Sequence, residues 1–248
     1  MSKFTFFDKH PELYERGFDY RKLNQQVKFL DKIFSKNKSK KILDIACGHT
    51  PQGRKLAKKG YQVSGIDLSG SLLKLAKKRA KEEGVKLKLY KKDMRNFNVG
   101  KFDSAYILFS SILHLNNKKD LLLHFKSVNK NLKKGGLYII DLSSLPFTSP
   151  DKPAKFKKTR QGLITNITYT PLKSSKSQAR FICTSLFKNK KVNKDSFIVL
   201  RFLPMSLLED LAKETGFEIK QIYRDFKFKT KLGKKPEYIA ILKKTSKI

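Results

Sequence analysis

The chain has 248 residues, enough for one large domain, and its hydrophobic content of 39% excludes a disordered chain. It carries 56 basic and 21 acidic residues, and the resulting net charge of +35 favours polyanionic partners. No apolar run reaches the roughly 18 residues that a membrane span needs, and the start, interrupted by Pro11, is unlike a signal peptide. We therefore expect a cytoplasmic protein with no membrane partner.

The basic residues are mostly lysines, spread along the whole chain from Lys3 to Lys247. Dedicated nucleic-acid sites usually add clustered arginines. The charge is explained either by solvated surface lysines or by a functional basic surface, so nucleic acid stays open as a partner. The two cysteines and four histidines lack the spacing of metal ligands, and no metal site is expected.

The first half of the chain alternates between predicted helices and predicted strands. Apolar spacing and capping residues predict helices over 20–37 and 51–59 and a third that starts at Ser69 or Ser71. A longer helix is expected over 118–132, where the glycines of KKGG end it. The five predicted strands read KKILDIA, YQVSGID, KLKLYKKD, FDSAYILFSS and LYIIDLS.

The composition changes near Ser143. The proline-rich segment SSLPFTSPDKP predicts a loop, and three runs rich in β-branched and aromatic residues follow at 163–170, 180–187 and 197–202. The polar stretches PLKSSKS and KNKKVNKD between these runs predict turns. The three runs are therefore expected to form an antiparallel meander.

The alternating pattern returns after the meander. Ser206 is expected to cap the helix in LLEDLAKETG and Gly216 to end it, and FEIKQIYRDF and EYIAILKK predict two closing strands. Strands that alternate with helices form a parallel, doubly wound sheet with right-handed crossovers. The predicted fold is an α/β fold with a mostly parallel, doubly wound seven-stranded sheet and an antiparallel β meander inserted at residues 146–202.

Three residues at the ends of successive predicted strands point to a nucleoside site. In open α/β sheets, ligands bind at the carboxyl ends of the strands. Gly48 after the first strand lets backbone approach a ligand, and Asp67 after the second can accept hydrogen bonds from both ribose hydroxyls. Asp93 after the third strand can pair with an adenine amino group. Neither a G-x-G-x-x-G fingerprint nor a phosphate-binding G-K-[ST] motif is present, which favours a cofactor without phosphate.

Six segments extend this pattern over nearly the whole chain: ILDIACG, GIDLS, KKDMRNF, FDSAYILFSSILHL, LKKGGLYIIDL and RFLPMSLLEDLAKETGFEI. Together they resemble class I S-adenosylmethionine-dependent methyltransferases, which have a Rossmann-like fold. The meander is similar to that of the small-molecule branch, which includes amino-sugar N-methyltransferases. The resemblance implies a cofactor-binding domain in 1–145 and 203–248, with 1–37 as an N-terminal lid and helix. It also implies a β lid in 146–202 that shapes the acceptor site.

The resemblance also implies roles for individual residues. Residues 46–48 would lie against the methionine part of the cofactor, and segment FSSILHL would line the junction between cofactor and acceptor. The expected cofactor-binding residues are Tyr14, Tyr20, Ala46, Cys47, Gly48, Asp67, Leu68, Asp93, Met94 and Phe109. The expected acceptor-binding residues are Ser110, His114, Tyr169 and Arg201. His114 is also the candidate catalytic residue, because an imidazole there could take a proton from the acceptor.

Thr50 departs from the family, which usually has a second glycine at this position. Because Thr50 precedes Pro51, its backbone is expected to be extended. We expect its side chain to point away from the cofactor and its hydroxyl to cap the helix that starts at Pro51. If the side chain points inward instead, it narrows the pocket and weakens cofactor binding.

Three functions are compatible with these residues. The first is transfer of a methyl group from S-adenosylmethionine, with S-adenosylhomocysteine as product, to a small-molecule acceptor. An amine acceptor is easier to explain than a hydroxyl, because an amine needs only to arrive unprotonated. A hydroxyl needs a base nearby, and His114 is the one good base candidate. The second function is RNA methylation that uses the basic surface, and the third is a non-catalytic module that has lost the cofactor. The atom methylated and the oligomeric state are left open.

Overall fold

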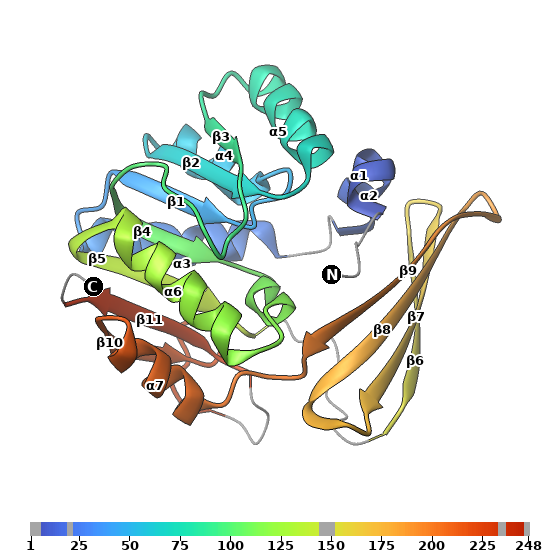
Figure 1. Ribbon diagram of the computed structural model, residues 1–248. Coiled ribbons are helices and arrows are strands. Elements are labelled where there is room, and N and C mark those ends of the chain that lie inside the picture. Colours follow the sequence, from blue (N-terminus) through green and yellow to red (C-terminus); the bar gives the residue numbers. More distant parts are fainter. Residues whose placement is uncertain (1–5, 19–21, 144–151, 233–236, 246–248) are drawn as a thin grey trace.

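The computed structural model describes residues 6–18, 22–143, 152–232 and 237–245. Its larger sheet consists of β1 (Lys41–Ile45), β2 (Gln62–Asp67), β3 (Lys88–Lys91), β4 (Phe102–Ile107), β5 (Leu132–Asp141), β10 (Phe217–Tyr223) and β11 (Ile239–Lys244). Their order is β10-β11-β5-β4-β1-β2-β3 (Figure 1). β11 runs antiparallel to its neighbours β5 and β10, and the other neighbouring pairs are parallel. The predicted Rossmann-like, mostly parallel seven-stranded sheet is confirmed.

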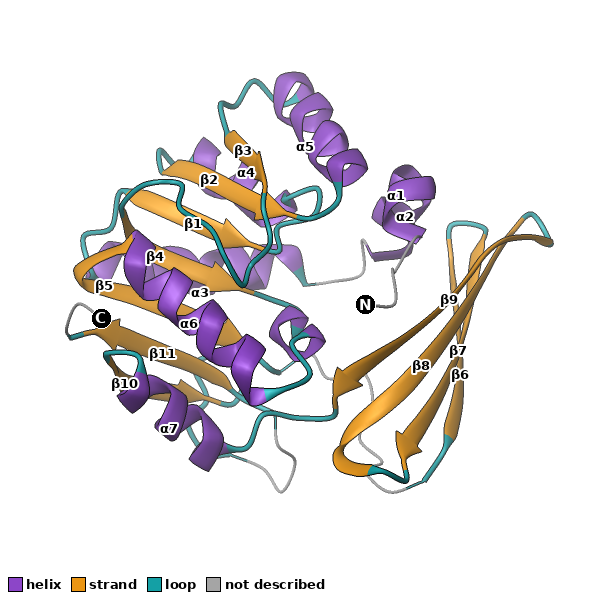
Figure 2. Ribbon diagram, viewed as in Figure 1, coloured by secondary structure: helices purple, strands orange, loops and turns teal. Residues whose placement is uncertain are grey.

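Helices cover both faces of this sheet because its central strands are apolar on both sides (Figure 2). The helices are α3 (Leu23–Lys36), α4 (Pro51–Lys58), α5 (Gly70–Glu82), α6 (Lys118–Asn131) and α7 (Met205–Glu214). α3 and α4 pack with Ile42 and Tyr106, whereas α6 and α7 pack with Leu43 and Ile107. Alternate residues of one strand thus contribute to two hydrophobic cores. Among the described residues, no helix is long and apolar enough to cross a membrane.

The second sheet is the predicted antiparallel meander, but it has one more strand than expected. Its strands are β6 (Ala154–Arg160), β7 (Leu163–Leu172), β8 (Ser175–Phe187) and β9 (Lys190–Leu200), paired in chain order. The sequence AKFKKTR of β6 was not predicted as a strand, because lysines typical of a protected sheet edge mask its pattern. The expected turns were too long: only Lys188 and Asn189, both with positive φ, separate β8 from β9.

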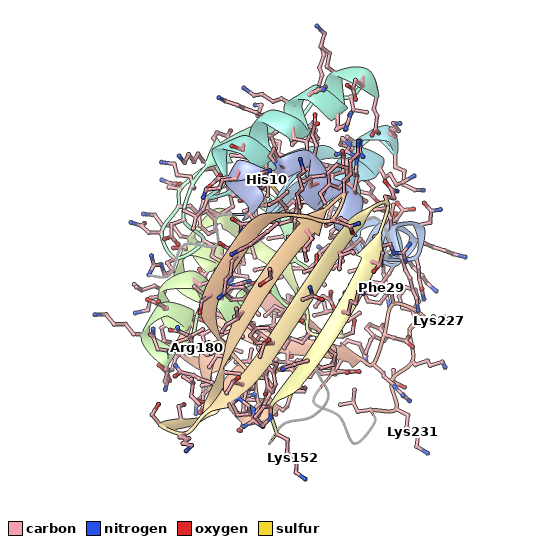
Figure 3. The ribbon with its side chains drawn as sticks, turned by 90° about the vertical axis from the view of Figure 1, so that its right-hand side faces the viewer. His10, Phe29, Lys152, Arg180, Lys227 and Lys231 are labelled. Atoms are coloured by element: carbon pink, nitrogen blue, oxygen red, sulfur yellow. The ribbon has the colours of Figure 1, made fainter. Side chains whose placement is uncertain are left out.

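Two short helices connect the two sheets. α1 (Phe6–Lys9) and α2 (Pro11–Phe18) lie between α5 and the tips of the meander strands (Figure 1). The Phe6 N–H donates to Asp195 of β9 at 3.0 Å, and a ring nitrogen of His10 lies 3.1 Å from the Val192 carbonyl. Figure 3 looks onto the meander from outside, with His10 beside its upper end and Arg180 on the inner strand β8. The N-terminal segment therefore touches both parts of the fold.

The bounds predicted as 51–59 and 118–132 agree with α4 and α6 to within one residue, whereas the predicted capping residues were correct only in part. Ser69 caps α5, since its hydroxyl accepts the Leu72 N–H at 3.1 Å. α6 ends at Asn131, and the next residue, Leu132, already has an extended backbone. The glycines of KKGG lie within β5, so the predicted glycine cap is wrong. Ser206 lies inside the first turn of α7, which begins after Pro204 without a side-chain cap. The division into 1–145 with 203–248 and 146–202 stays a prediction.

Candidate active site

The structure joins the glycine turn after β1 to the carboxylate that ends β2. The Gly48 N–H donates to Asp67 Oδ2 at 2.7 Å, and the Ser69 N–H donates to Asp67 Oδ1 at 2.8 Å. Burial raises the pKa of Asp67 above its usual value, and these two N–H groups oppose that rise. Each carboxylate oxygen keeps a lone pair for a ligand. The site therefore presents an oriented, partly exposed carboxylate beside a backbone with no Cβ.

The turn itself holds every second residue in the left-handed region. Ala46, Gly48 and Thr50 have φ of 52°, 55° and 46°. Non-glycine residues in this region each cost about 1 kcal/mol and persist where the surrounding structure holds them. The backbone of the turn therefore curls around the carboxyl end of β1, where a ligand of the sheet would bind.

Thr50 differs from its prediction in backbone and in hydrogen bonding. Its backbone is left-handed rather than extended, and its side chain makes no bond that caps α4. The hydroxyl instead donates to Asp44 Oδ2 at 2.7 Å, inside the core. Gly53 makes this possible, because a Cβ there would overlap Thr50 Oγ1. The Thr50 side chain is completely buried, and the expectation that it points away from the cofactor stays a prediction.

We expect Gly53→Ala to destabilise the fold by about 2 kcal/mol, because the new methyl group displaces the Thr50 hydroxyl from a packed site. Urea unfolding measures the change. The double variant Thr50→Gly with Gly53→Ala removes the overlap and should be more stable than Gly53→Ala alone. A double variant less stable than both single variants would contradict this account of Thr50.

Asp44 is a buried acid that the sequence did not single out. It is 4% exposed and lies one layer below the turn, where it accepts the Thr50 hydroxyl. Burial raises the pKa of Asp44 from 3.8 to about 7; the hydrogen bond from Thr50 and the Tyr106 hydroxyl oppose the rise and the charge of Asp67 adds to it. The folded protein therefore binds this proton more tightly than the unfolded chain does.

The raised pKa predicts a loss of stability with rising pH. The contribution of Asp44 to the free energy of unfolding is fully present below pH 3.8, the pKa in the unfolded chain, and is lost as the pH rises through the folded-state pKa of about 7. Asp44→Asn carries no proton to lose, so the wild type should lose on the order of 4 kcal/mol relative to this variant over that window. Urea unfolding of both proteins at a series of pH values measures the difference. A constant difference across the window would show that Asp44 is ionised at all of these pH values.

The adenine side of the predicted site contains an ion pair. The Asp93 carboxylate accepts two hydrogen bonds from Arg95, one from Nη2 of the guanidinium at 2.6 Å and one from the backbone N–H at 2.8 Å. Burial raises the pKa of Asp93, but the bonds from Arg95 outweigh it and hold the pKa below its usual value. The side chain of Asp93 is still 27% exposed, so part of the carboxylate is open to a ligand. Nearby, Leu68 at the end of β2 is 52% exposed, and Met94 is partly buried against the core.

A strained corner ends β4 on the acceptor side. Phe109 and Ser110 both have positive φ, of 58° and 56°. Asp141 at the end of β5 holds both residues: its Oδ2 accepts the Phe109 N–H at 2.9 Å and its carbonyl accepts the Ser110 N–H at 3.0 Å. The Ser110 hydroxyl is buried without a hydrogen-bond partner among the described residues. Two strained residues and an unsatisfied hydroxyl are typical of a functional site.

His114 lies in a one-turn helix, η1 (Ser111–His114), that follows this corner. The residue is exposed, yet the surrounding protein desolvates its imidazole and so lowers the pKa of His114 below the usual value. The ring lies 5.5 Å from that of Phe197 on β9. The imidazole is therefore neutral at neutral pH and can accept a proton.

The meander presents a row of aromatic rings to this side. Tyr169, Phe181 and Phe197 are cross-strand neighbours on β7, β8 and β9, and their rings pack 5.2 and 5.7 Å apart. Because Phe197 also contacts His114, this row extends from the meander to the end of β4. Arg201 follows β9, where its N–H donates to the Ser177 carbonyl at 2.9 Å. Tyr169 is thus a packed member of the row, with 3% of its surface exposed.

The N-terminal helices cover the glycine turn. Tyr14 is buried, packs edge-on against His49, and would lie 4.0 Å from a Cβ built on Gly48. Glu15 accepts Arg79 Nη2 of α5 at 2.6 Å, which fixes α2 beside the site. Tyr20, the other residue expected in this lid, lies outside the described residues. Cys47 is packed between β1 and β2, where its N–H donates to the Ile66 carbonyl.

Neither Asp44 nor Asp141 was predicted as a site residue. Asp44 lies inside a predicted strand and Asp141 inside the strand LYIIDLS, where an acid in an apolar run was the available signal. Within the described part of the chain, no group of three or more His, Cys, Asp or Glu could hold a metal ion.

The amino-acid sequence is similar to those of known methyltransferases. Residues 42–136 match a family model described as a methyltransferase domain. The protein YqeM of Bacillus subtilis (strain 168) is 38% identical over 106 residues, which cover 42% of each chain. A Streptomyces venezuelae protein named dTDP-3-amino-3,4,6-trideoxy-alpha-D-glucopyranose N,N-dimethyltransferase is 28% identical over 149 residues, 57% of this chain and 60% of that protein. The chain thus spans about half the length of these curated relatives.

Solved structures match over nearly the whole chain, which shows the fold. A Clostridium acetobutylicum ATCC 824 structure, described as an S-adenosylmethionine-dependent methyltransferase, has a TM-score of 0.83 at 18% identity and covers 97% of this chain and 99% of that one. DesVI of Streptomyces venezuelae has a TM-score of 0.71 at 19% identity and covers 96% and 98%. The chain is therefore similar to methyltransferase domains over residues 42–136 and has the fold of the S-adenosylmethionine-dependent methyltransferases.

Proposed function

We propose that this protein is an S-adenosylmethionine-dependent methyltransferase that acts on the amine of a small molecule. The observation that carries the proposal is the contact between Gly48 and Asp67, which places a partly exposed carboxylate against a backbone turn without a Cβ. The methyltransferase domain and its relatives support the same reaction. The RNA alternative has no comparable support, because no relative or structure named above has nucleic acid in its name.

The residues of the site fit the proposed cofactor. Asp67 would accept the two ribose hydroxyls, and the exposed side chain of Leu68 would lie under the base. Ala46, Cys47 and Gly48 would contact the methionine part, and Asp93 with Met94 would frame the adenine. Tyr14 would close the site from above, since it already covers the glycine turn.

The protein's part in the reaction is to align the reactants and exclude water. When bound, S-adenosylmethionine supplies a methyl group on a positively charged sulfur, an electrophile that needs no further activation. Ser110, held by Asp141, would orient the acceptor at the end of β4, and Phe109 beside it would contact the cofactor. The Ser110 hydroxyl would bond to the acceptor, which would satisfy a buried group that has no partner among the described residues. His114 would take the proton that the amine releases, because its lowered pKa keeps it neutral.

The meander would form the outer wall of the acceptor site. Its aromatic row, Tyr169, Phe181 and Phe197, ends at His114, and Phe197, which is only partly buried, would contact the body of the acceptor. Arg201 lies at the base of the meander and would contact the acceptor from that side. The relative that methylates the amino group of a nucleotide-linked sugar suggests an amino sugar as the first acceptor to test.

The test is formation of S-adenosylhomocysteine from S-adenosylmethionine in the presence of a chosen acceptor. A nucleotide-linked amino sugar and its hydroxyl counterpart form a matched pair, and the proposal predicts product with the amine and little with the hydroxyl. Product with RNA and with neither sugar would replace the small-molecule proposal with the RNA alternative. A protein that binds no S-adenosylmethionine at about 100 μM would support the non-catalytic alternative.

A further inference from the structure

One side of α6 is polar and binds the irregular segment that follows β3. His124, Ser127 and Asn131 recur at helical spacing, and all three are buried. A ring nitrogen of His124 lies 2.8 Å from the Met94 carbonyl, and the Ser127 hydroxyl donates to the Arg95 carbonyl at 2.8 Å. Asn131 donates to the Phe97 carbonyl at 2.9 Å and accepts the Val99 N–H at 2.8 Å. Buried backbone without regular structure needs such partners, and α6 supplies them in sequence.

His124 links this segment to the core of the sheet. Its Nδ1 faces the Met94 carbonyl, so Nδ1 carries the hydrogen and Nε2 accepts the hydroxyl of Tyr138 on β5 at 2.6 Å. Burial lowers the pKa of His124 to about 4, against the bond to Met94 and the charge of Asp93. The ring is therefore neutral, and its two bonds fix one tautomer and one orientation.

The peptide group between Met94 and Arg95 connects His124 to Asp93. The Met94–Arg95 peptide has its carbonyl bonded to His124, while its N–H donates to Asp93 Oδ1 at 2.8 Å. A shift of the carbonyl would therefore move the N–H that orients the carboxylate. Asp93 also pairs with the Arg95 guanidinium, which in turn reaches Asp120 on α6 at 3.3 Å. The position of Asp93 thus depends on α6 through two connections.

We propose that His124 is a positioning residue for recognition of the adenine base, because it fixes the Met94–Arg95 peptide that orients the carboxylate of Asp93. This inference rests on the proposed function, in which Asp93 accepts the adenine 6-amino group. His124 itself touches no ligand. Its effect is on the choice of base, since a displaced carboxylate no longer distinguishes an amino group from an oxygen.

The experiment compares two ligands by calorimetry: S-adenosylhomocysteine and S-inosylhomocysteine, in which oxygen replaces the 6-amino group. The wild type should bind the adenosyl compound about tenfold more tightly or better, since the inosyl oxygen faces a carboxylate. His124→Asn keeps a donor at the position of Nδ1 and should keep this ratio within about twofold. His124→Gln places its amide at the position of Nε2, leaves Met94 without a donor, and should reduce the ratio to about two or less.

The matched control is Asn129→Ala, which removes a buried side chain that α6 uses on another side, where it donates to the Thr215 carbonyl at 2.9 Å. It should lower stability in urea without changing the ratio. Ser127→Ala removes the bond to the Arg95 carbonyl, which belongs to the next peptide group. It should reduce the ratio partly, and it tests the attachment of this segment to α6 if His124→Gln folds poorly. A ratio unchanged in both His124→Gln and Ser127→Ala would overturn the inference. A wild type that binds neither compound would overturn the proposed function, and this inference with it.

Discussion

Replacing Asp67 with alanine should weaken binding of S-adenosylhomocysteine by about 100-fold or more. Asp67 would accept both ribose hydroxyls, and each hydrogen bond to a charged group contributes about 1.5–3 kcal/mol. The same substitution leaves the Gly48 and Ser69 N–H groups without their acceptor, so the glycine turn would also lose its orientation. Isothermal titration calorimetry of the two proteins measures the difference directly.

Asp103 provides the matched control. It lies at the amino end of β4, away from the site, and its Oδ2 accepts the Lys40 and Lys41 N–H groups at 2.8 Å each. Asp103→Ala therefore removes a carboxylate that also holds two backbone N–H groups, and it should lower stability with little effect on affinity. Equal loss of affinity in both variants would mean that Asp67 acts through stability and not through the ribose.

Replacing His114 with alanine should lower turnover of an amine acceptor by about 100-fold while leaving cofactor affinity unchanged. A positioned general base contributes about 10²–10⁴ in rate. The pKa of His114 lies below its usual value because the surrounding protein desolvates it. The wild-type rate should therefore rise as the pH passes through this lowered pKa, because the neutral ring is the active form, and the variant should lack this part of the profile.

His114→Gln separates proton transfer from shape. Glutamine can fill the space beside Phe197 and donate a hydrogen bond, but it cannot take a proton at neutral pH. We expect it to be as slow as the alanine variant. Turnover that is unchanged at all pH values in His114→Ala would end the proposed role of His114 as base, and turnover restored by glutamine would make it a residue that orients the acceptor.

The main sheet could be predicted because its strands and helices alternate and its apolar runs are long. Gly48 and Asp67 were predicted as parts of one site because parallel strands bring their carboxyl ends to one edge, and the Gly48–Asp67 hydrogen bond shows that they meet. β6 was missed because the pattern of an edge strand rich in lysine resembles that of a loop.

Other parts of the site depend on contacts that no local pattern specifies. Thr50 was expected to be extended because it precedes proline, but its bond to the buried Asp44 and the space left by Gly53 stabilise a left-handed backbone. The connection from His124 to Met94 joins residues 30 positions apart and depends on how α6 packs on the sheet. A buried polar residue on a helix indicates a partner without identifying it.

The most direct test of the account is a crystal structure of the protein with S-adenosylhomocysteine. It predicts the ribose hydroxyls on the carboxylate of Asp67, the methionine part along residues 46–48, and the adenine between Leu68 and the Asp93–Met94 turn. A ligand bound elsewhere, or a ribose that does not contact Asp67, would contradict the central claim that this carboxylate and the adjoining glycine turn form the cofactor site.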